Sequence, residues 1–181
     1  TEDKRFFFHP GVDLKGIMRA TYVNLKAGRI VQGGSTITQQ LAKNLFLTPE
    51  RSFTRKLHEL ILSFWLEMRF SKEQLLSIYL NRVYLGSGTY GVQAASEKYF
   101  NKKVEELNLY ECALIASLLK APSKYNPIAN EKLSRIRTSK VLENMKKSNL
   151  ISAKNVTEAK LNNKNYNKFT SAPKSTRYFI D

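Results

Sequence analysis

Helix start and stop signals recur along this chain, and they constrain its fold more than any other feature. Asp13 stands before a mixed apolar and basic stretch that ends at Gly28, which predicts a helix from Leu14 to about Ala27. Ser35 or Thr36 can cap a second helix, with Gln39 placed as a capping-box partner. Comparable signals predict helices over residues 53–68, 71–86, 92–99, 108–120, from 132 onwards and 152–161. Because no segment has a strong strand pattern, we expect a mainly α fold.

The predicted helix from Phe53 to Met68 is apolar over much of its surface. A helix of that kind is expected at the centre of a core. Glu59 lies on this helix, one turn after Arg55 and Lys56. We therefore expect the Glu59 carboxylate to be at least partly enclosed and close to these two cations.

The chain has 181 residues and a net charge of +15, which implies an anionic partner such as a nucleic acid, an anionic membrane surface or a phosphorylated substrate. The excess is uneven: residues 1–14 carry −1, 15–56 carry +7, 57–130 carry +1 and 131–181 carry +8. A uniformly basic surface would not leave the middle of the chain balanced. The charge excess is therefore localised in two stretches of the chain.

Few residues can support metal or thiol chemistry. His9 and His58 are the only histidines and Cys112 is the only cysteine, so a transition-metal centre of the His/Cys type is excluded. Cys112 stands in an apolar run and is expected to be a small buried side chain. The glycine-rich turn at 86–91 follows no predicted strand and has no Lys-Ser/Thr ending, so it is a poor candidate for a phosphate-binding loop.

Carboxylate chemistry is better supported than metal chemistry. Glu2 and Glu59 flank a segment in which residues 15–56 carry eight Lys or Arg and a single acid, Glu50. One carboxylate can accept a proton while the basic groups hold a phosphate-bearing leaving group. Aromatic residues follow Glu2 at positions 6–8, and such neighbours withdraw a carboxylate from water.

Three motifs follow one another along the chain: Glu2-Asp3-x-x-Phe6-x-x-His9-x-Gly11, then Gly34-Ser35-Thr36-Ile37-Thr38-Gln39-Gln40-Leu41-x-Lys43-Asn44, then Arg55-Lys56-x-x-Glu59. In order and spacing they resemble the signatures of the bacterial peptidoglycan glycosyltransferases, the transglycosylase domains of class A penicillin-binding proteins and of monofunctional transglycosylases. The match continues with Tyr79-Leu80-Asn81 and Ala121-Pro122-x-x-Tyr125-x-Pro127. The resemblance covers about residues 1–161 and implies a lysozyme-like fold, with a larger globular lobe and a small membrane-facing jaw lobe at about 14–50.

The resemblance implies polymerisation of lipid II into β-1,4-linked glycan strands, with inversion at the anomeric carbon and release of undecaprenyl pyrophosphate. Glu2 would be the general base at the acceptor hydroxyl, and Glu59 would support the donor pyrophosphate directly or through a divalent cation such as Mg²⁺, with no cofactor obligatory. The implied substrate-binding residues are Asp3, His9, Gln32, Ser35, Thr36, Gln39, Gln40, Lys43, Asn44, Arg51, Arg55 and Lys56.

The resemblance also implies a place and a set of partners. We expect the outer, periplasmic or extracellular, face of the bacterial cytoplasmic membrane, with the helix at 14–27 lying in the membrane interface. No nucleic acid is expected as a partner. The chain starts at the catalytic motif and ends on Arg177 to Asp181, which resembles the lead into a transpeptidase. We therefore expect a piece of a longer protein, with residues 162–181 as a linker to a fused transpeptidase domain.

Three positions depart from the family pattern, and two other function classes remain open. Ser63 and Ser77 stand where Ala and Glu are usual, and Asn101 stands where Gly is usual, although Asn tolerates a left-handed turn. A lysozyme-like hydrolase or lytic transglycosylase would act on the same glycan, but it would not need the basic cluster. A nucleic-acid-binding module fits the net charge, but no recognised motif supports it.

Overall fold

The regular structure of this protein is helical. The computed structural model describes residues 2–48, 50 and 52–162, and within these residues it contains helices and one isolated bridge between Tyr84 and Tyr90, with no strand. The mainly α class expected from the sequence is therefore confirmed. The chain divides into two compact units, residues 2–83 and the residues from 84 onwards.

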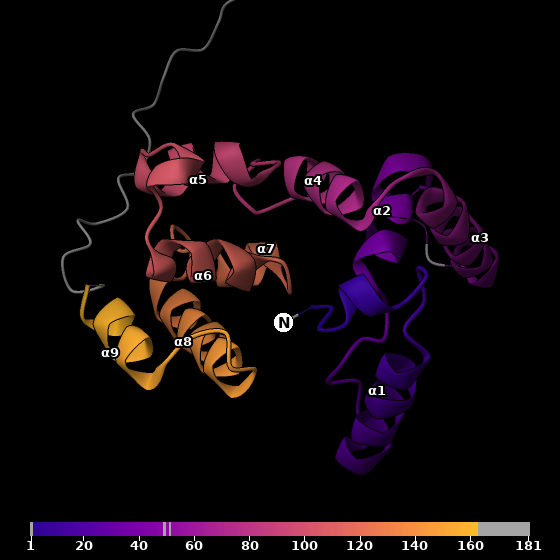
Figure 1. Ribbon diagram of the computed structural model, residues 1–181, viewed down its shortest axis with the longest axis horizontal. Helices are drawn as coiled ribbons and strands as arrows, with labels where there is room; N and C mark the ends of the chain where they lie inside the picture. The colour runs from indigo at the N-terminus through magenta and orange to yellow at the C-terminus, as the bar shows by residue number, and fades with distance from the viewer. Residues whose placement is uncertain (1, 49, 51, 163–181) are drawn as a thin grey trace, which may run out of the picture. The chain divides into compact units, whose positions relative to one another are not determined.

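The first unit is built around a helix that packs on two others. Its elements are η1 (Phe6–Phe8), α1 (Leu14–Ala27), α2 (Ile37–Phe46), α3 (Phe53–Arg69) and α4 (Lys72–Arg82) (Figure 1). Helix α2 contacts both α3 and α4. Leu41, Leu66, Leu75 and Tyr79 from these three helices are almost completely buried and form the core of the unit.

The helix boundaries of this unit follow the capping residues. Asp13 accepts a hydrogen bond from the Gly16 N–H at 2.8 Å, and α1 ends at Gly28, whose φ of +61° is left-handed. Of the two candidate caps of α2, Thr36 is the one used. Helix α4 has the complete Ser71 capping box, but it ends at Arg82 and not at residue 86, because Val83 is already extended with ψ 137°.

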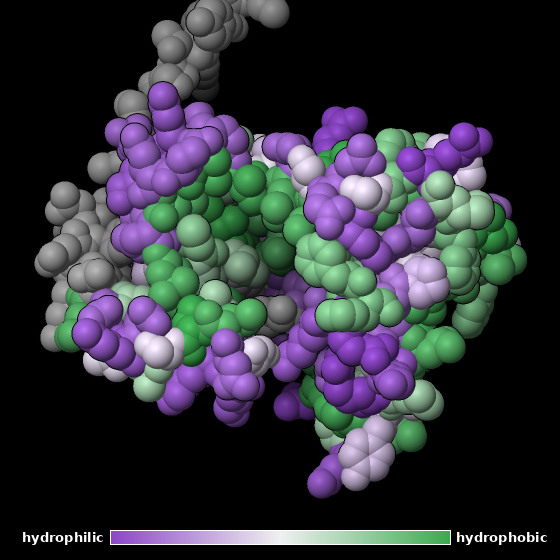
Figure 2. Space-filling view, in the orientation of Figure 1, coloured by the Kyte–Doolittle hydropathy of each residue, from purple (hydrophilic) through white to green (hydrophobic). Residues whose placement is uncertain are grey.

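The position expected for α3 in the core is wrong. Its apolar side chains are largely exposed, with Leu57 at 57%, Ile61 at 58% and Met68 at 77%. Apolar surface is visible where α3 lies, at the right of Figure 2. One narrow stripe of the helix, which includes Glu59, Ser63 and Leu66, is buried instead. Hydrophobicity around the whole helix therefore does not mark a central helix here.

The second unit has a conventional apolar core. Its elements are α5 (Val92–Phe100), η2 (Val104–Glu106), α6 (Leu109–Leu118), α7 (Pro122–Tyr125), α8 (Glu131–Lys147) and α9 (Ala153–Asn162). Helix α6 packs mainly on α8 and contributes Leu114 and Leu118, while α8 contributes Val141 and Leu142. The described residues of this unit end at 162, so the predicted linker at 163–181 lies outside them.

Two residues of the second unit, Asn101 and Cys112, can be compared with what the sequence predicted for them. Asn101 ends α5 with φ +53°, so the turn usually made by glycine is kept in the left-handed conformation. Cys112 is exposed and not buried as expected, because it lies with Ala116, one turn later, on the one stripe of α6 that is not fully buried. Its helical surroundings still raise the pKa of the thiol, chiefly by desolvation and then by the charge of Glu111.

Candidate active site

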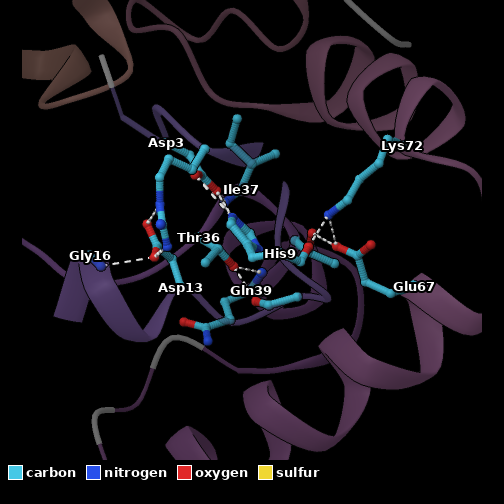
Figure 3. A network of polar contacts seen from close by, with 12 residues as sticks. Asp3, His9, Asp13, Gly16, Thr36, Ile37, Gln39, Glu67 and Lys72 are labelled. Atoms are coloured by element: carbon cyan, nitrogen blue, oxygen red, sulfur yellow. Dashed lines mark hydrogen bonds and ion pairs between the residues drawn. The ribbon is translucent and has the colours of Figure 1, made fainter. Parts of the chain in front are cut away.

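The segment that carries Glu2, residues 2–13 (the Glu2 segment), is fixed to the start of α2. The Asp3 carboxylate lies 3.0 Å from Nε2 of His9, and both side chains are almost completely buried. The same carboxylate accepts a hydrogen bond of 3.1 Å from the backbone N–H of Ile37, the first residue of α2 (Figure 3). A carboxylate at a helix N-terminus also interacts favourably with the helix dipole. Glu2, which is half-buried, therefore sits next to a residue anchored on α2.

A second carboxylate fixes the other end of this segment. Asp13 caps α1 through Gly16 and forms an ion pair with Arg5, in the middle of the segment. The hydrogen bond from Arg5 is the main reason why the pKa of Asp13 lies below its ordinary value; burial opposes this shift. Of the three phenylalanines that follow Glu2, only Phe6 is buried, whereas Phe7 and Phe8 are 55% and 86% exposed. Rings as exposed as those of Phe7 and Phe8 withdraw little of a neighbouring carboxylate from water.

Helix α2 begins with residues that contact both neighbouring segments. The Thr36 hydroxyl accepts a hydrogen bond from the Gln39 N–H at 3.2 Å and donates one to the Gly11 carbonyl at 2.6 Å. Thr36 and Gln39 are 1% and 2% exposed. The polar residues of the second motif therefore start the helix and bind the Glu2 segment at the same time.

The Glu59 carboxylate is buried in a cluster of cations, as expected from its position on α3. Its Oε1 lies 3.2 Å from Nε of Arg55, and its Oε2 lies 2.7 Å from Nζ of Lys56. The Lys56 ammonium also donates to Oγ of Ser35 at 3.0 Å and to Oε1 of Gln39 at 3.3 Å. Lys56 therefore joins the second and third motifs at the start of α2.

Tyr79 contacts the next polar residue of α2. Its phenol donates a hydrogen bond of 3.0 Å to Oε1 of Gln40. Burial, and then the negative charge of Glu2, raises the pKa of this phenol, so it stays protonated and remains a donor. Glu2 and Gln40 thus both act on Tyr79. Sequence reasoning placed Tyr79 in a motif but gave it no role.

The remaining candidate residues are placed less tightly. Lys43 is half-buried and makes no ion pair with any described residue, while Asn44 is exposed. The Gln32 backbone is bound to the Asn24 side chain, with N–H to Oδ1 at 3.0 Å, in the loop before α2. Arg51 lies outside the described residues.

A small polar pocket opens beside Glu2. Its lining comes from the Glu2 segment, from the first residues of α1 and from the loop before α2: Glu2, Asp3, Lys4, Asp13, Gly16, Arg19, Gly33, Gly34, Ser35 and Thr36. The pocket therefore has a carboxylate on one side and the start of α2 on the other. This arrangement suits a ligand that gives up a proton and carries negative charge nearby.

The described residues offer limited support for a metal ion. They contain no group of three or more His, Cys, Asp or Glu side chains placed to hold one. Both oxygens of Glu59 are already paired with Arg55 and Lys56. Mg²⁺ commonly binds through one or two carboxylates together with substrate phosphates. Glu59 alone could therefore supply at most one protein ligand.

Comparisons with known proteins give the family of this chain. The family model described as Transglycosylase matches residues 1–146. Penicillin-binding protein 1A of Aquifex aeolicus (strain VF5) is 49% identical over 184 residues, which cover 100% of this chain and 25% of that protein. Penicillin-binding protein 1F of Bacillus subtilis (strain 168) is 49% identical over 158 residues, which cover 87% of this chain and 22% of that protein.

A crystal structure of penicillin-binding protein 1A from Haemophilus influenzae is also similar, with a TM-score of 0.45 and 35% identity over 68% of this chain and 15% of that one. The chain belongs to the transglycosylase family, and its helical domain is an enzyme domain of the peptidoglycan glycosyltransferase class. It spans about a quarter of the length of the penicillin-binding proteins 1A and 1F that it matches.

Proposed function

We propose that this chain polymerises lipid II into glycan strands with release of undecaprenyl pyrophosphate. The observation that carries the proposal is that two separate groups of residues meet at the start of α2. Asp3, next to Glu2, binds the Ile37 N–H, while Lys56 of the Glu59 cluster binds Ser35 and Gln39. A candidate base and a candidate anion-binding cluster are therefore held by the same helix turn, as a transfer from a pyrophosphate donor requires.

In the proposed reaction, Glu2 removes the proton of the acceptor 4-hydroxyl. The oxygen of that hydroxyl forms a bond to the anomeric carbon of the donor. The bond between that carbon and the pyrophosphate oxygen breaks, and the electron pair leaves with undecaprenyl pyrophosphate. A single displacement of this kind inverts the anomeric configuration and needs one base and no covalent nucleophile. Lys43, Lys56 and Arg55 offset the negative charge of the leaving group, and Glu59 holds Lys56 and Arg55 in place. The other substrate-binding residues implied by the family, Arg51 among them, are proposed to line the cleft for the pyrophosphate and the sugars.

The proposed reaction needs no metal ion. Because the cations around Glu59 can neutralise pyrophosphate, a divalent cation such as Mg²⁺ would add charge neutralisation but would not be obligatory. If it binds, Glu59 is the protein residue that holds it. Polymerisation that persists in excess EDTA supports this view, and a complete loss that Mg²⁺ restores contradicts it.

The proposed site of action is the outer face of the cytoplasmic membrane. Within the described residues no helix is long and apolar enough to cross a bilayer. Helix α1, however, exposes Leu14, Met18 and Leu25 at 64–77% and carries Lys15 and Lys26. Such a helix can lie in a lipid interface. Met18→Glu should reduce sedimentation with anionic lipid vesicles more than a surface change of the same charge in the second unit, Gln93→Glu.

The matched relatives are penicillin-binding proteins, and this chain corresponds to about a quarter of each. We propose that its partners are lipid II, the growing lipid-linked strand and a fused transpeptidase domain, with no nucleic acid among them.

Incubation of the protein with labelled lipid II tests the proposed activity. Longer strands and free undecaprenyl pyrophosphate are the expected products. No product from lipid II, together with cleavage of finished glycan, would instead identify a hydrolase or lytic transglycosylase. Tight, salt-sensitive binding of oligonucleotides without any response to lipid II would identify a nucleic-acid-binding module.

A further inference from the structure

We propose that Glu67 and Lys72 are positioning residues that hold the Glu2 segment in place for the transfer. This inference rests on the proposed function, because it concerns how the candidate base is oriented. Neither residue lines the pocket beside Glu2, and neither was singled out in the sequence. Their effect would therefore pass through the backbone of the segment; Figure 3 shows Lys72 and Glu67 beside His9.

Lys72, the first residue of α4, binds the segment at two points. Its ammonium donates a hydrogen bond of 2.6 Å to the His9 carbonyl and lies 4.5 Å from the centre of the Phe6 ring. It also pairs with Oε1 of Glu67 at 2.7 Å. An ammonium has three N–H donors and no acceptor, and the partners of Lys72 are a carbonyl, a carboxylate and the face of an aromatic ring, all of which attract such a group. With a side chain 18% exposed, Lys72 is held away from most of the solvent.

Glu67, near the end of α3, connects Lys72 to α2. The same Oε1 accepts a hydrogen bond of 2.5 Å from the hydroxyl of Thr38, a residue of α2 that is completely buried. The Glu67 side chain is 9% exposed. Removing its charge would leave the Lys72 ammonium enclosed without a counter-ion, and such losses are costly.

Gly11 shows how closely the segment rests on this pair. A Cβ at Gly11 would lie 3.3 Å from Cγ of Glu67 and 3.3 Å from the Ser63 carbonyl. The φ angle of Gly11 is +79°, in the left-handed region. The carbonyl of Gly11 is held by Thr36 at 2.6 Å. The segment is therefore fixed at two carbonyls two residues apart, one by α4 and one by the start of α2.

The path from this pair to the base is short. Lys72 fixes the backbone of His9, the His9 ring holds the Asp3 carboxylate at 3.0 Å, and Asp3 adjoins Glu2. Loss of the Lys72 contact frees the backbone on which this ring is mounted. Misplacement of a reacting group by about 1 Å can cost roughly 100-fold in rate. The pair should therefore control kcat far more than substrate binding.

The second unit contains a matched control. Lys102 and Glu111 form an ion pair of the same length, 2.7 Å, with the Glu111 side chain 3% exposed. Lys102→Met and Lys72→Met each remove one lysine from a largely buried carboxylate, so both should lower Tm. Only Lys72→Met removes a contact with the Glu2 segment.

The test compares kcat and KM for lipid II, and Tm, in four variants. Lys72→Met should lower kcat by about 10- to 100-fold with KM changed less than about threefold, whereas Lys102→Met should keep kcat within about twofold. Lys72→Arg, which keeps charged donors, should recover most of the lost kcat. Glu67→Gln should show a smaller fall, and it tests the idea should Lys72→Met not fold. An equal kcat in the Lys72 and Lys102 variants, or an unchanged kcat in Glu67→Gln, would overturn the proposal.

Amide hydrogen exchange gives a readout that does not need activity. The N–H groups of Phe8 and Gly11 are bonded to the carbonyls of Arg5 and His9. They should exchange faster in Lys72→Met and at the wild-type rate in Lys102→Met. Unchanged exchange in Lys72→Met would refute the positioning role. If the wild-type protein makes no strands, the proposed function fails, and the exchange experiment still decides whether Lys72 holds the segment.

Discussion

The two units of this chain distribute polar and apolar side chains differently. Residues 2–83 bury the ionisable side chains His9, Asp13 and Glu59, and they also contain most of the exposed large apolar side chains of the described residues. The unit from 84 onwards buries one acid, Glu111, but its interior is formed mainly by apolar side chains such as Leu114, Leu118 and Leu142, and its described part exposes few large apolar side chains. The second unit has the pattern of a domain that is stabilised by an apolar core. The first unit has paired polar groups in its interior and leaves apolar surface open, a pattern that is typical of a binding site or an interaction surface.

The largest effect should come from Glu2, the proposed general base, which lies in the first unit. Glu2→Gln should reduce polymerisation by about a thousandfold or more, because a general base contributes roughly 10²–10⁴. Lipid II binding and Tm should change little. Glu50→Gln, an exposed acid in the same unit, is the control and should retain activity. Appreciable turnover by Glu2→Gln would remove Glu2 as the base.

The difference between the two units should be measurable as stability. Leu142 is 0% exposed in the second unit, so Leu142→Ala should lower the free energy of unfolding by about 2–5 kcal/mol. Leu57 on α3 is 57% exposed, and Leu57→Ala should cost less than about 1 kcal/mol. Denaturant titration of both variants gives the comparison. Similar losses in the two variants would mean that the exposed face of α3 is covered in solution.

Lys56 should mainly affect substrate binding, because the pyrophosphate that it is proposed to hold is already charged in the bound donor. Lys56→Ala removes a cation that contacts Glu59, Ser35 and Gln39, so KM for lipid II should rise about tenfold, as expected for one charge-assisted contact. Lys43→Ala should act in the same direction. Lys98→Ala, an exposed lysine on α5, controls for net charge. A KM that stays at the wild-type value in both site variants would argue against their roles in the donor site.

The smallest effect should be the pH dependence contributed by Asp13. Because Arg5 lowers its pKa in the folded state, Asp13 adds stability above its ordinary pKa of 3.8, and this contribution is lost as pH falls through the lower folded value. The difference in Tm between wild type and Asp13→Asn should therefore shrink as pH is lowered from 7 to about 3. A difference that is constant across this range would show that Asp13 acts by capping alone.

Local signals predicted well wherever a residue contacts its own neighbourhood in the chain. Asp13, Gly28 and Asn101 determine where helices begin or end, and all three do so as expected. Glu59 could be placed among Arg55 and Lys56 because helical spacing alone brings them together. The family resemblance supplied the roles of these residues, which their spacing alone could not.

Contacts between elements were not predictable in the same way. Lys72 and Glu67 are five residues apart across a helix break, so no helical spacing connects them, and His9 is 63 residues from Lys72. The exposure of α3 was missed because an apolar helix has the same sequence pattern whether protein or another apolar phase covers it. Cys112 was missed because an apolar run does not show which face of its helix points inwards.

The docking of the Glu2 segment has a consequence for the order of folding. Its anchors, Thr36, Glu67 and Lys72, lie in helices that follow it in the chain. Although this segment leaves the ribosome before the rest of the unit, it has nothing to bind until α2, α3 and α4 have assembled. We expect residues 2–13 to be the last part of the first unit to gain protection in pulsed hydrogen exchange. Early protection of this segment would contradict that order, whereas late protection would mean that the base is set in place only on a completed scaffold.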